Sequence, residues 1–526
     1  MAIAYYLTVP MKRILRGVAL GVCLAKPVAA QFPRLAPPPP CKATGPAPSY
    51  LTYWSAAAAR DARPKVAVFA LQPEIDDANR LFLAVLVPER IRQRLSRDSR
   101  IHVATEASVS RAYMESRSRQ DSAARILDAD YVISGKLFVS GDRQEIHLTL
   151  TRPGHAAAVW QASFRATTAL RAVEDAAVRG LARALRLPAT PTLPQGWPTT
   201  DGGYDALLAG DAFMRTPTRT GLDSALFYYG RALTLEPASG MAAARLARAS
   251  VEMLERGGEI PGYPGTAGQQ RVNELIARAF AAESSSEVWT VKAMLSRVTD
   301  PVRFNGALSS HTRAVRRDPD DADAQHEYGM TLLRLGDTRG AEARFRRALG
   351  ISPGRANTLA ALAELELEAS RWSAACAVSN ASIAAWPYDP APYATRAEAR
   401  LRLSDARDAF SDAELVARLA PGAWPEALRL LIKQRTSNVD DARQQITALT
   451  GRWLSPGLEL SVKDAEFMAI AYLAMGDQRR AIESLRRARP VGTDLRVALR
   501  GPRLAAIRSD TAVARMIIEA EGRDRR

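Results

Sequence analysis

Four prolines recur at a constant interval, and this interval constrains the fold more than any other feature of the chain. They lie 34 residues apart: Pro319, Pro353, Pro387 and Pro421. Alanines follow the same interval, because Ala375 and Ala409 lie 34 and 68 residues after Ala341. A proline ends a helix, since it lacks a backbone N–H and clashes with the preceding turn. A small residue lets two helices approach closely. The chain is therefore predicted to form a series of similar helical hairpins.

One repeat, residues 322–355, shows the pattern in full. Gly329, directly after Tyr328, is expected at the tight contact between the two helices, and Gly336-Asp337 is expected to form the turn between them. The second helix is expected to direct three residues toward the first: Ala341, Phe345 and Ala348.

The same offsets occur on both sides of this repeat. Ala206–Pro237 carries them at three positions: Ala225, Tyr229 and Ala232. Residues 240–284 are interpreted as a stretched repeat with an inserted Gly- and Pro-rich loop. A final repeat is expected to start near Val462, with a turn at Gly476-Asp477 and three inner positions: Ala481, Leu485 and Ala488.

The period and these positions resemble those of tetratricopeptide-repeat (TPR) proteins. Two stretches, Tyr204–Gly210 and Pro502–Asp510, look like the start and the end of TPR arrays that follow TolB-like domains. The resemblance implies a right-handed superhelix whose concave groove binds extended peptides or partner helices. The repeat register places seven residues on the face that lines this groove: His326, Met330, Arg334, Asn357, Glu364, Glu398 and Arg402. The alternative for each is an ordinary solvated helix residue.

The front of the chain has the pattern of a secretory signal peptide. A positively charged region precedes a short apolar run and a group of small residues: Lys12, Arg13, Arg16, Gly17–Ala25 and Val28–Ala30. We expect residues 1–30 to be removed by cleavage after Ala30 and the protein to be exported to the periplasm. The alternatives are an uncleaved membrane anchor and a cytoplasmic protein. Residues 31–62, with four consecutive prolines, are expected to be an extended linker.

Residues 63–187 are expected to form an α/β domain. Strands are predicted within this range at 66–71, 101–104, 131–137, 145–150 and 158–164. Helices are predicted between them and after them, at 81–95, 123–127 and 170–185. The order of elements is thus β-α-β-α-β-β-β-α.

This order, with several short motifs, resembles the amino-terminal domain of TolB. The motifs are a first strand, a helix ending, a second strand, a strand that ends in glycine, and a tryptophan: Val66–Phe69, Leu95–Arg97, Arg100–Ala104, Ala129–Gly135 and Trp160. After the first strand the chain departs from the family, because it has Gln72-Pro73-Glu74 instead of asparagine and serine. Three acidic residues there either bind a cation or cap the next helix: Glu74, Asp76 and Asp77.

The remaining boundaries follow from composition. Residues 188–203 are expected to be a linker, since four prolines and a double glycine do not continue a helix. The TPR array is expected over 204–435, an irregular connection over 436–461, and a C-terminal repeat with its cap over 462–526. The expected fold class is therefore an α/β domain followed by an all-α TPR solenoid.

The sequence gives little sign of catalysis or of a metal site. None of the phosphate-binding, zinc-protease, serine-hydrolase or CxxC motifs appears in the 526 residues. The histidines do not pair at a metal-ligand spacing: His102, His147, His155, His311 and His326. Of the three cysteines, Cys23, Cys41 and Cys376, the last is expected to be a small core residue. We therefore expect no catalytic residue, cofactor or metal.

The net charge of +16 arises from 72 basic and 56 acidic residues. Arginines are spread along the chain among acids, which favours a compositional cause over an anionic partner such as nucleic acid. The expected function is a non-enzymatic protein–protein interaction scaffold of the bacterial cell envelope, with protein partners and no small-molecule substrate. One alternative is a cytoplasmic regulatory TPR protein, related to the tails that regulate adenylate cyclases or transcriptional regulators. A nucleic-acid-binding protein is another.

Overall fold

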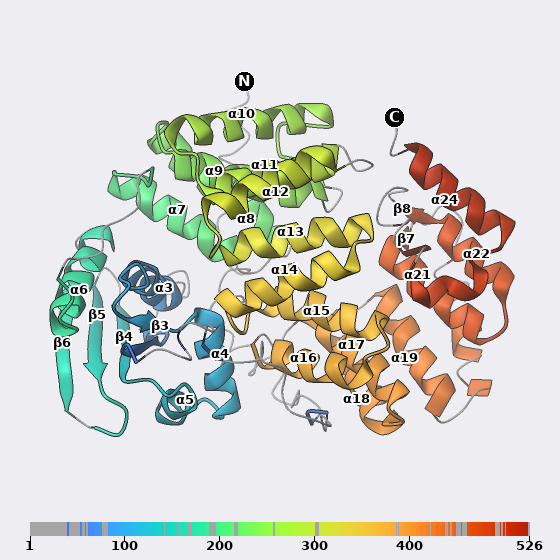
Figure 1. Cartoon of the computed structure of the whole chain (residues 1–526), viewed down its shortest axis with the longest axis horizontal. Coiled ribbons are helices and arrows are strands. Elements are labelled where there is room, and N and C mark those ends of the chain that lie inside the picture. Colours follow the sequence, from blue (N-terminus) through green and yellow to red (C-terminus); the bar gives the residue numbers. More distant parts are fainter. Residues whose placement is uncertain are drawn as a thin grey trace.

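The fold was analysed in a computed structural model, which describes residues 39–41 and most of the chain from 53 to 523. The description leaves out residues 1–38, 76–82, 189–195 and 524–526, much of 42–61, 437–459 and 490–500, and shorter stretches elsewhere. The expected signal peptide lies outside the described residues. An α/β domain lies on the left of Figure 1, and a long array of paired helices extends from it. In the described part of the chain, no helix combines the length and the apolar character needed to cross a membrane.

The α/β domain contains one mixed sheet with the strand order β3-β1-β4-β5-β6. Its strands are β1 (Lys65–Val68), β2 (Gln72–Ile75), β3 (His102–Val103), β4 (Tyr131–Ser140), β5 (Arg143–Thr151) and β6 (Ala158–Arg165). Strands β1 and β3 are parallel, β1 and β4 are parallel, and β4, β5 and β6 form an antiparallel meander. The five predicted strands are thus confirmed in position, with small differences at their ends.

Two elements of this domain were not predicted. The segment Gln72–Ile75, expected to be a loop, forms β2, which continues the edge of β1 along β4. Pro73 fits there because β2 has a neighbour on one side only. Glu74 does not cap a helix, because it lies in this strand and its carboxylate is 2.9 Å from the ammonium group of Lys136. Asp76 and Asp77 lie outside the described residues. The second addition is helix α4 (Glu106–Glu115).

Helices cover both faces of the sheet. Helices α3 (Leu83–Leu95) and α6 (Leu170–Ala184) contact each other on one face, and α4 and α5 (Gln120–Ile126) contact each other on the other. Side chains of β1 alternate between two hydrophobic clusters: Val66 and Val68 belong to one, Ala67 and Phe69 to the other. This burial on both faces explains the continuous apolar run that predicts the first strand.

The array consists of antiparallel helix pairs, as predicted, but its first helix begins at Asp201 and so includes Gly202 and Gly203, which were expected to belong to the linker. The pairs are α7 (Asp201–Met214) with α8 (Arg219–Leu235), α9 (Gly240–Glu255) with α10 (Thr266–Ala282), α11 (Ser286–Thr299) with α12 (Asn305–Arg317), α13 (Ala322–Leu335) with α14 (Thr338–Ile351), α15 (Ala356–Glu368) with α16 (Trp372–Ala385), and α17 (Pro390–Arg402) with α18 (Ala406–Leu419). Each second helix also packs on the next first helix, so that the pairs stack on one another along the array.

The C-terminal part is less regular. It contains α19 (Ala423–Thr436), α21 (Val462–Ala474), α22 (Gln478–Arg486), the short 3₁₀ helix η5 (Pro502–Ile507) and α24 (Thr511–Arg523). Ala488, expected on the inner side of a helix, is buried but belongs instead to the short strand β8 (Ala488–Arg489). Helix α22 ends at Arg486, so the residues that follow it can form a strand. Strand β8 pairs in parallel with β7 (Leu460–Ser461).

The turn residues act as the sequence predicts. Gly336 has a φ of 85°, in the left-handed region that favours glycine, and Asp337 accepts a hydrogen bond from the backbone N–H of Gly340. The equivalent pair repeats the arrangement, since Gly476 has a φ of 80° and Asp477 caps α22. The repeats therefore share local caps as well as a period.

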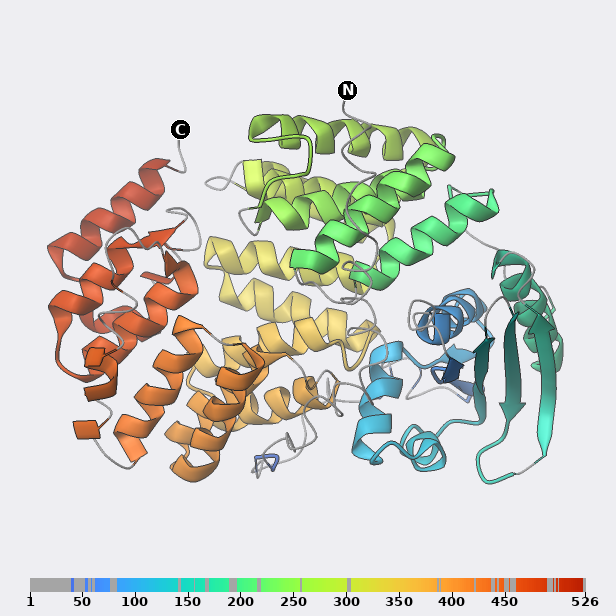
Figure 2. The same ribbon diagram turned by 180° about the vertical axis from the view of Figure 1, so that it is seen from behind.

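The α/β domain packs directly on the array. Helix α4 contacts α16, and the hydroxyl groups of Thr105 and Ser108 each donate to the carbonyl oxygen of Pro353 at 3.0 Å (Figures 1 and 2). Elsewhere in the interface, the guanidinium group of Arg90 on α3 donates to the hydroxyl oxygen of Tyr204 on α7 at 3.3 Å. These contacts fix the position of the domain on the array.

Candidate functional site: the inner face of the helical array

The first helices of the pairs form one continuous surface, which we call the inner face. Helix α9 contacts α11, α11 contacts α13, and α15 contacts α17. Charged side chains from these helices meet in two groups. We call them the arginine network and the glutamate cluster.

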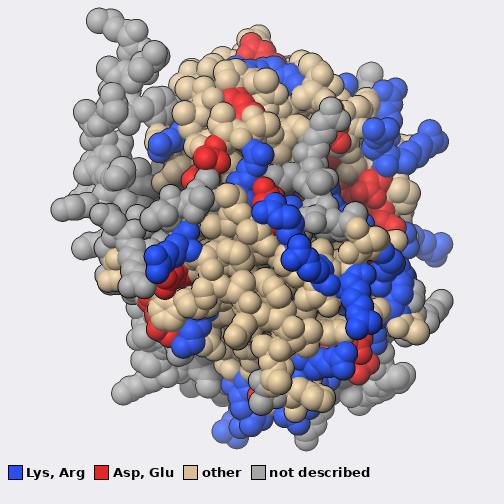
Figure 3. Space-filling model, turned by 90° about the vertical axis from the view of Figure 1, so that its left-hand side faces the viewer, with Lys and Arg blue, Asp and Glu red and all other residues tan. Residues whose placement is uncertain are grey.

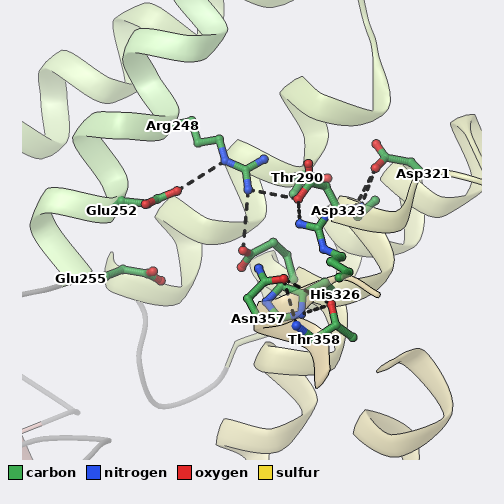
Figure 4. A network of polar contacts seen from close by, with 12 residues as sticks. Arg248, Glu252, Glu255, Thr290, Asp321, Asp323, His326, Asn357 and Thr358 are labelled. Carbon is green, nitrogen blue, oxygen red and sulfur yellow. Dashed lines mark hydrogen bonds and ion pairs between the residues drawn. The ribbon is translucent and has the colours of Figure 1, made fainter. Parts of the chain in front are cut away.

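The arginine network begins on α9 (Figure 4). The guanidinium group of Arg248 lies 3.5 Å from Glu252 on its own helix, 3.3 Å from Asp323 and 3.9 Å from Glu327 on α13. Arg355, at the start of α15, also pairs with Asp323. The first helices α9, α13 and α15 are therefore joined by charges of opposite sign.

A second arginine extends the network along α11. Arg297 is 3% exposed and lies 2.6 Å from Glu255 and 2.9 Å from Glu327. Arg334 lies 3.7 Å from Glu255 as well. Burial would raise the pKa of Glu327, but Arg297 and the other cations around it lower this pKa to about 2. The carboxylate therefore stays ionised, which a buried ion pair requires.

The histidines of this region are neutral near pH 7. Burial lowers the pKa of His326 to about 4, and its Nδ1 lies 3.1 Å from the hydroxyl oxygen of Thr358. Burial also lowers the pKa of His311 to about 3, and its ring stacks on Tyr328 with the centres 5.2 Å apart. Both rings therefore contribute to packing and hydrogen bonding within the array.

The glutamate cluster lies further along the inner face. It consists of Glu364 and Glu368 on α15, Glu398 on α17 and Glu466 on α21, which surround Arg503 of η5. Arg503 donates to both oxygens of Glu398, at 2.9 and 3.2 Å, and to Glu364 at 3.2 Å. Glu466 lies 3.8 Å from the same guanidinium group. The chain's own C-terminal segment thus occupies part of the inner face.

The cluster has more negative than positive charge. Burial raises the pKa of Glu466 to about 7, and although Arg503 opposes this rise, the neighbouring carboxylates add to it. Burial would also raise the pKa of Glu364, but Arg503 keeps it below the ordinary range. Arg503 therefore neutralises its nearest partners more completely than it neutralises Glu466.

The seven residues predicted to line the groove fall into different environments. Glu364 and Glu398 are brought together by Arg503, and Arg334 belongs to the arginine network. His326 is buried, and Met330 is partly buried against the cluster around Phe345. Asn357 and Arg402 are exposed. Their role in binding a partner stays a prediction.

Sequence reasoning missed the residues that tie the inner face together: Arg248, Arg297, Asp323, Glu327, Glu466 and Arg503. Asp323 and Glu327 lie in the same helix as His326, three residues before it and one residue after it. The repeat register that places His326 could therefore have placed these two residues as well. The register contains no such signal for Arg503, because it lies outside the helix pairs.

A disulfide was also missed. Cys376, predicted to be a small core residue, is fully buried but is bonded to Cys41, with their Cα atoms 6.0 Å apart. The two cysteines are 335 residues apart in the sequence. Among the described residues, no group of histidine, cysteine and acidic side chains is arranged to hold a metal ion.

On the face shown in Figure 3, basic side chains border a wide uncharged area and are accompanied by acidic side chains. The inner face likewise carries side chains of both charges, which are paired with one another.

The helix pairs and their 34-residue period define the class of fold: the described part of the chain is a TPR-like helical solenoid with an additional small α/β domain. No family model matches it, and no curated protein matches it.

Three solved structures illustrate the similarity in the arrangement of helices. One is pilF of Pseudomonas aeruginosa, with 18% identity over 44% of this chain and 98% of that one, and a TM-score of 0.35. PilW, a type IV pilus biogenesis factor, has 18% identity over 41% and 95%, with a TM-score of 0.34. The Cut9–Hcn1 structure of the APC/C has 14% identity over 61% and 56%, with a TM-score of 0.41. The class assignment rests on the helix pairs and not on these likenesses.

Proposed function

We propose that this protein is a non-enzymatic scaffold of the bacterial cell envelope that binds partner polypeptides on the inner face of its TPR array. The observation that carries the proposal is the convergence of charged side chains from α9, α11, α13, α15, α17 and α21 on one surface. A surface with fixed charges of both signs selects partners by complementary charge. The α/β domain, which resembles the TolB amino-terminal domain, would contact a second envelope component.

The disulfide supports export. Disulfides persist in oxidising compartments such as the bacterial periplasm and are rare in the cytoplasm. The bond between Cys41 and Cys376 therefore agrees with the signal peptide expected at residues 1–30.

Export is tested by fusing alkaline phosphatase after residue 62, since this enzyme is active only outside the cytoplasm. We expect an active fusion, and an inactive one when the positive charges at Lys12, Arg13 and Arg16 are replaced by glutamate. Activity absent from the unaltered fusion would contradict export and favour the cytoplasmic regulatory alternative.

Binding is tested with two exposed residues of the inner face. The variant Asn357→Arg with Arg402→Glu changes charge on the first helices α15 and α17. The matched control, Asn273→Arg with Arg339→Glu, makes the same changes at exposed positions of the second helices α10 and α14. We expect proteins that co-purify with the native chain and the control to be lost from the inner-face variant. Equal recovery by all three would place binding elsewhere.

A further inference from the structure

The residues around the disulfide form more than a covalent link. Asn380 on α16 contacts both backbone groups of Cys41: its Oδ1 accepts from the N–H at 3.3 Å, and its Nδ2 donates to the carbonyl oxygen at 3.4 Å. Arg400 on α17 donates to the carbonyl oxygen of Pro39. Hydrogen bonds to the N–H and C=O of one residue, and to the carbonyl oxygen two residues earlier, all lie on one edge of an extended backbone and recognise that conformation.

The side chain of Cys41 also packs on an apolar surface of the array. It packs against four buried residues from α15, α16 and α17: Leu367, Ala375, Cys376 and Ala399. Trp372 packs against the same cluster. Polar contacts to the backbone and an apolar patch under the side chain together form a site for a peptide.

The polar part of this site is built from buried charges. Arg396 and Arg400 are 2% and 1% exposed, and both bind Asp412, which is fully buried, at 2.6 and 2.5 Å. Arg396 also donates to Oδ1 of Asn380 at 2.9 Å, which holds the amide in place.

The two guanidinium groups share the carboxylate of Asp412, and that of Arg400 also lies 3.6 Å from Asp405 and 3.9 Å from Asp408. Arg400 finds further acceptors in the carbonyl oxygens of Asp408, at 3.2 Å, and of Pro39. An acceptor supplied by a peptide is favourable here because a buried donor without a partner is costly.

We propose that the surface formed by α16 and α17 is a binding site for an extended, proline-containing peptide backbone, and that residues 39–41 of the same chain are its ligand. The disulfide between Cys41 and Cys376 then makes the bound state permanent. Consecutive prolines favour the extended conformation in advance and lower the entropic cost of binding. The proposal does not depend on the proposed function.

Bound in this way, the N-terminal segment connects the two domains. Trp54, further along the same segment, donates from its indole nitrogen to the carbonyl oxygen of Leu127 in the α/β domain at 2.5 Å. The segment is therefore attached to the array at Cys41 and to the α/β domain at Trp54.

The test measures how strongly the folded chain favours the disulfide. In the full chain with Cys23→Ser, the two thiols react with oxidised glutathione to give the protein disulfide and two molecules of reduced glutathione. Two electrons pass from the protein thiols to glutathione in this exchange. The equilibrium constant is the effective concentration of one thiol at the other, and recognition of the backbone raises it.

Asn380→Leu removes both hydrogen bonds to Cys41, and we expect it to lower the effective concentration about tenfold. The matched control is Asn273→Leu, at an exposed position of α10 where the amide donates only to the carbonyl oxygen of Gln269 on its own helix. We expect this control to leave the value unchanged.

A second variant lies in the segment itself, outside the array core, so that it does not endanger folding. Pro39→Gly with Pro40→Gly makes the segment more flexible, and we expect a loss of about three- to tenfold. Values within twofold of the native chain for both this variant and Asn380→Leu would show that the disulfide forms by proximity alone, and would overturn the proposal.

Discussion

At the scale of single residues, small side chains and charges determine how the helices meet. Gly329 lies where a Cβ atom would be 2.6 Å from Cε1 of Phe345, and Gly210 lies where it would be 2.4 Å from Tyr229. The close contact between paired helices therefore depends on the absence of a side chain at these positions. On the inner face, the ionised state of a buried carboxyl group depends on its cationic partner, as that of Glu327 depends on Arg297.

We predict that Gly329→Ala destabilises the protein by about 1–3 kcal/mol, because Phe345 is fully buried and has no space to move. Gly230→Ala is the matched control, since a Cβ there meets nothing within 4 Å on helix α8. The control is expected to be neutral or to stabilise by about 0.5–1 kcal/mol. Urea-induced unfolding measures both. Equal effects would mean that the helices do not meet as closely as described.

A second prediction concerns pH. The pKa of Glu466 is about 7 in the folded chain, above its ordinary value of 4.5. A raised pKa favours the folded state at low pH, and this contribution is lost as the pH rises from about 4.5 through 7. Glu466→Gln removes the titrating group, so we expect the variant to gain about 1–3 kcal/mol relative to the native chain at pH 8. At pH 4 we expect little difference.

The measurement is the free energy of unfolding of both chains across this pH range. Glu398→Gln serves as the comparison, because it loses one oxygen of the two-point contact with Arg503 and should destabilise at pH 8. A gain for Glu466→Gln that is the same at pH 4 and pH 8 would contradict the assigned pKa.

At the scale of elements, the short helix η5 joins distant parts of the inner face. Its Arg503 reaches α15, α17 and α21, which are far apart in sequence but adjacent on the inner face. The guanidinium carbon also lies 5.5 Å from the ring centre of Phe467. One side chain of a short helix therefore joins three first helices.

We predict that Arg503→Met destabilises the protein by about 2–4 kcal/mol at pH 8, because the four glutamates lose their common cation. The loss should be smaller at pH 5, where Glu466 is protonated, and smaller at pH 8 in the double variant with Glu466→Gln. Arg479→Met, at an exposed position of α22, is expected to change stability by no more than about 0.5 kcal/mol. Thermal unfolding at the two pH values distinguishes these outcomes.

At the scale of the whole molecule, the α/β domain and the array form one structure through backbone contacts. Gly354 has a φ of 81°, and a Cβ atom there would be 3.0 Å from both the carbonyl carbon and the oxygen of Ala107 on α4. The carbonyl oxygen of the adjacent Pro353 accepts hydrogen bonds from the hydroxyl groups of Thr105 and Ser108. The turn between α14 and α15 is therefore also the contact point of the two domains.

We predict that Gly354→Ala loosens this contact. Gly336→Ala is the matched control, because Gly336 has nearly the same φ, 85°, but a Cβ there meets nothing within 4 Å. Both variants incur the cost of a positive φ, of about 1 kcal/mol, and Gly354→Ala should lose about 1–2 kcal/mol more. Limited proteolysis between the domains should accelerate for Gly354→Ala alone. Identical behaviour of the two variants would remove the proposed role of this turn.

The sequence by itself determined the helix pairs of the array, their turns and most strands of the α/β domain. These follow from local rules, since a proline every 34 residues, a Gly-Asp turn and alternating apolar residues act within a few residues of where they stand. Only the tertiary structure decided which distant residues meet: Cys41 with Cys376, Arg503 with Glu364 and Glu398, and α4 with α16. These contacts depend on how the stacked pairs curve and where each end of the chain returns, and no local pattern encodes that path.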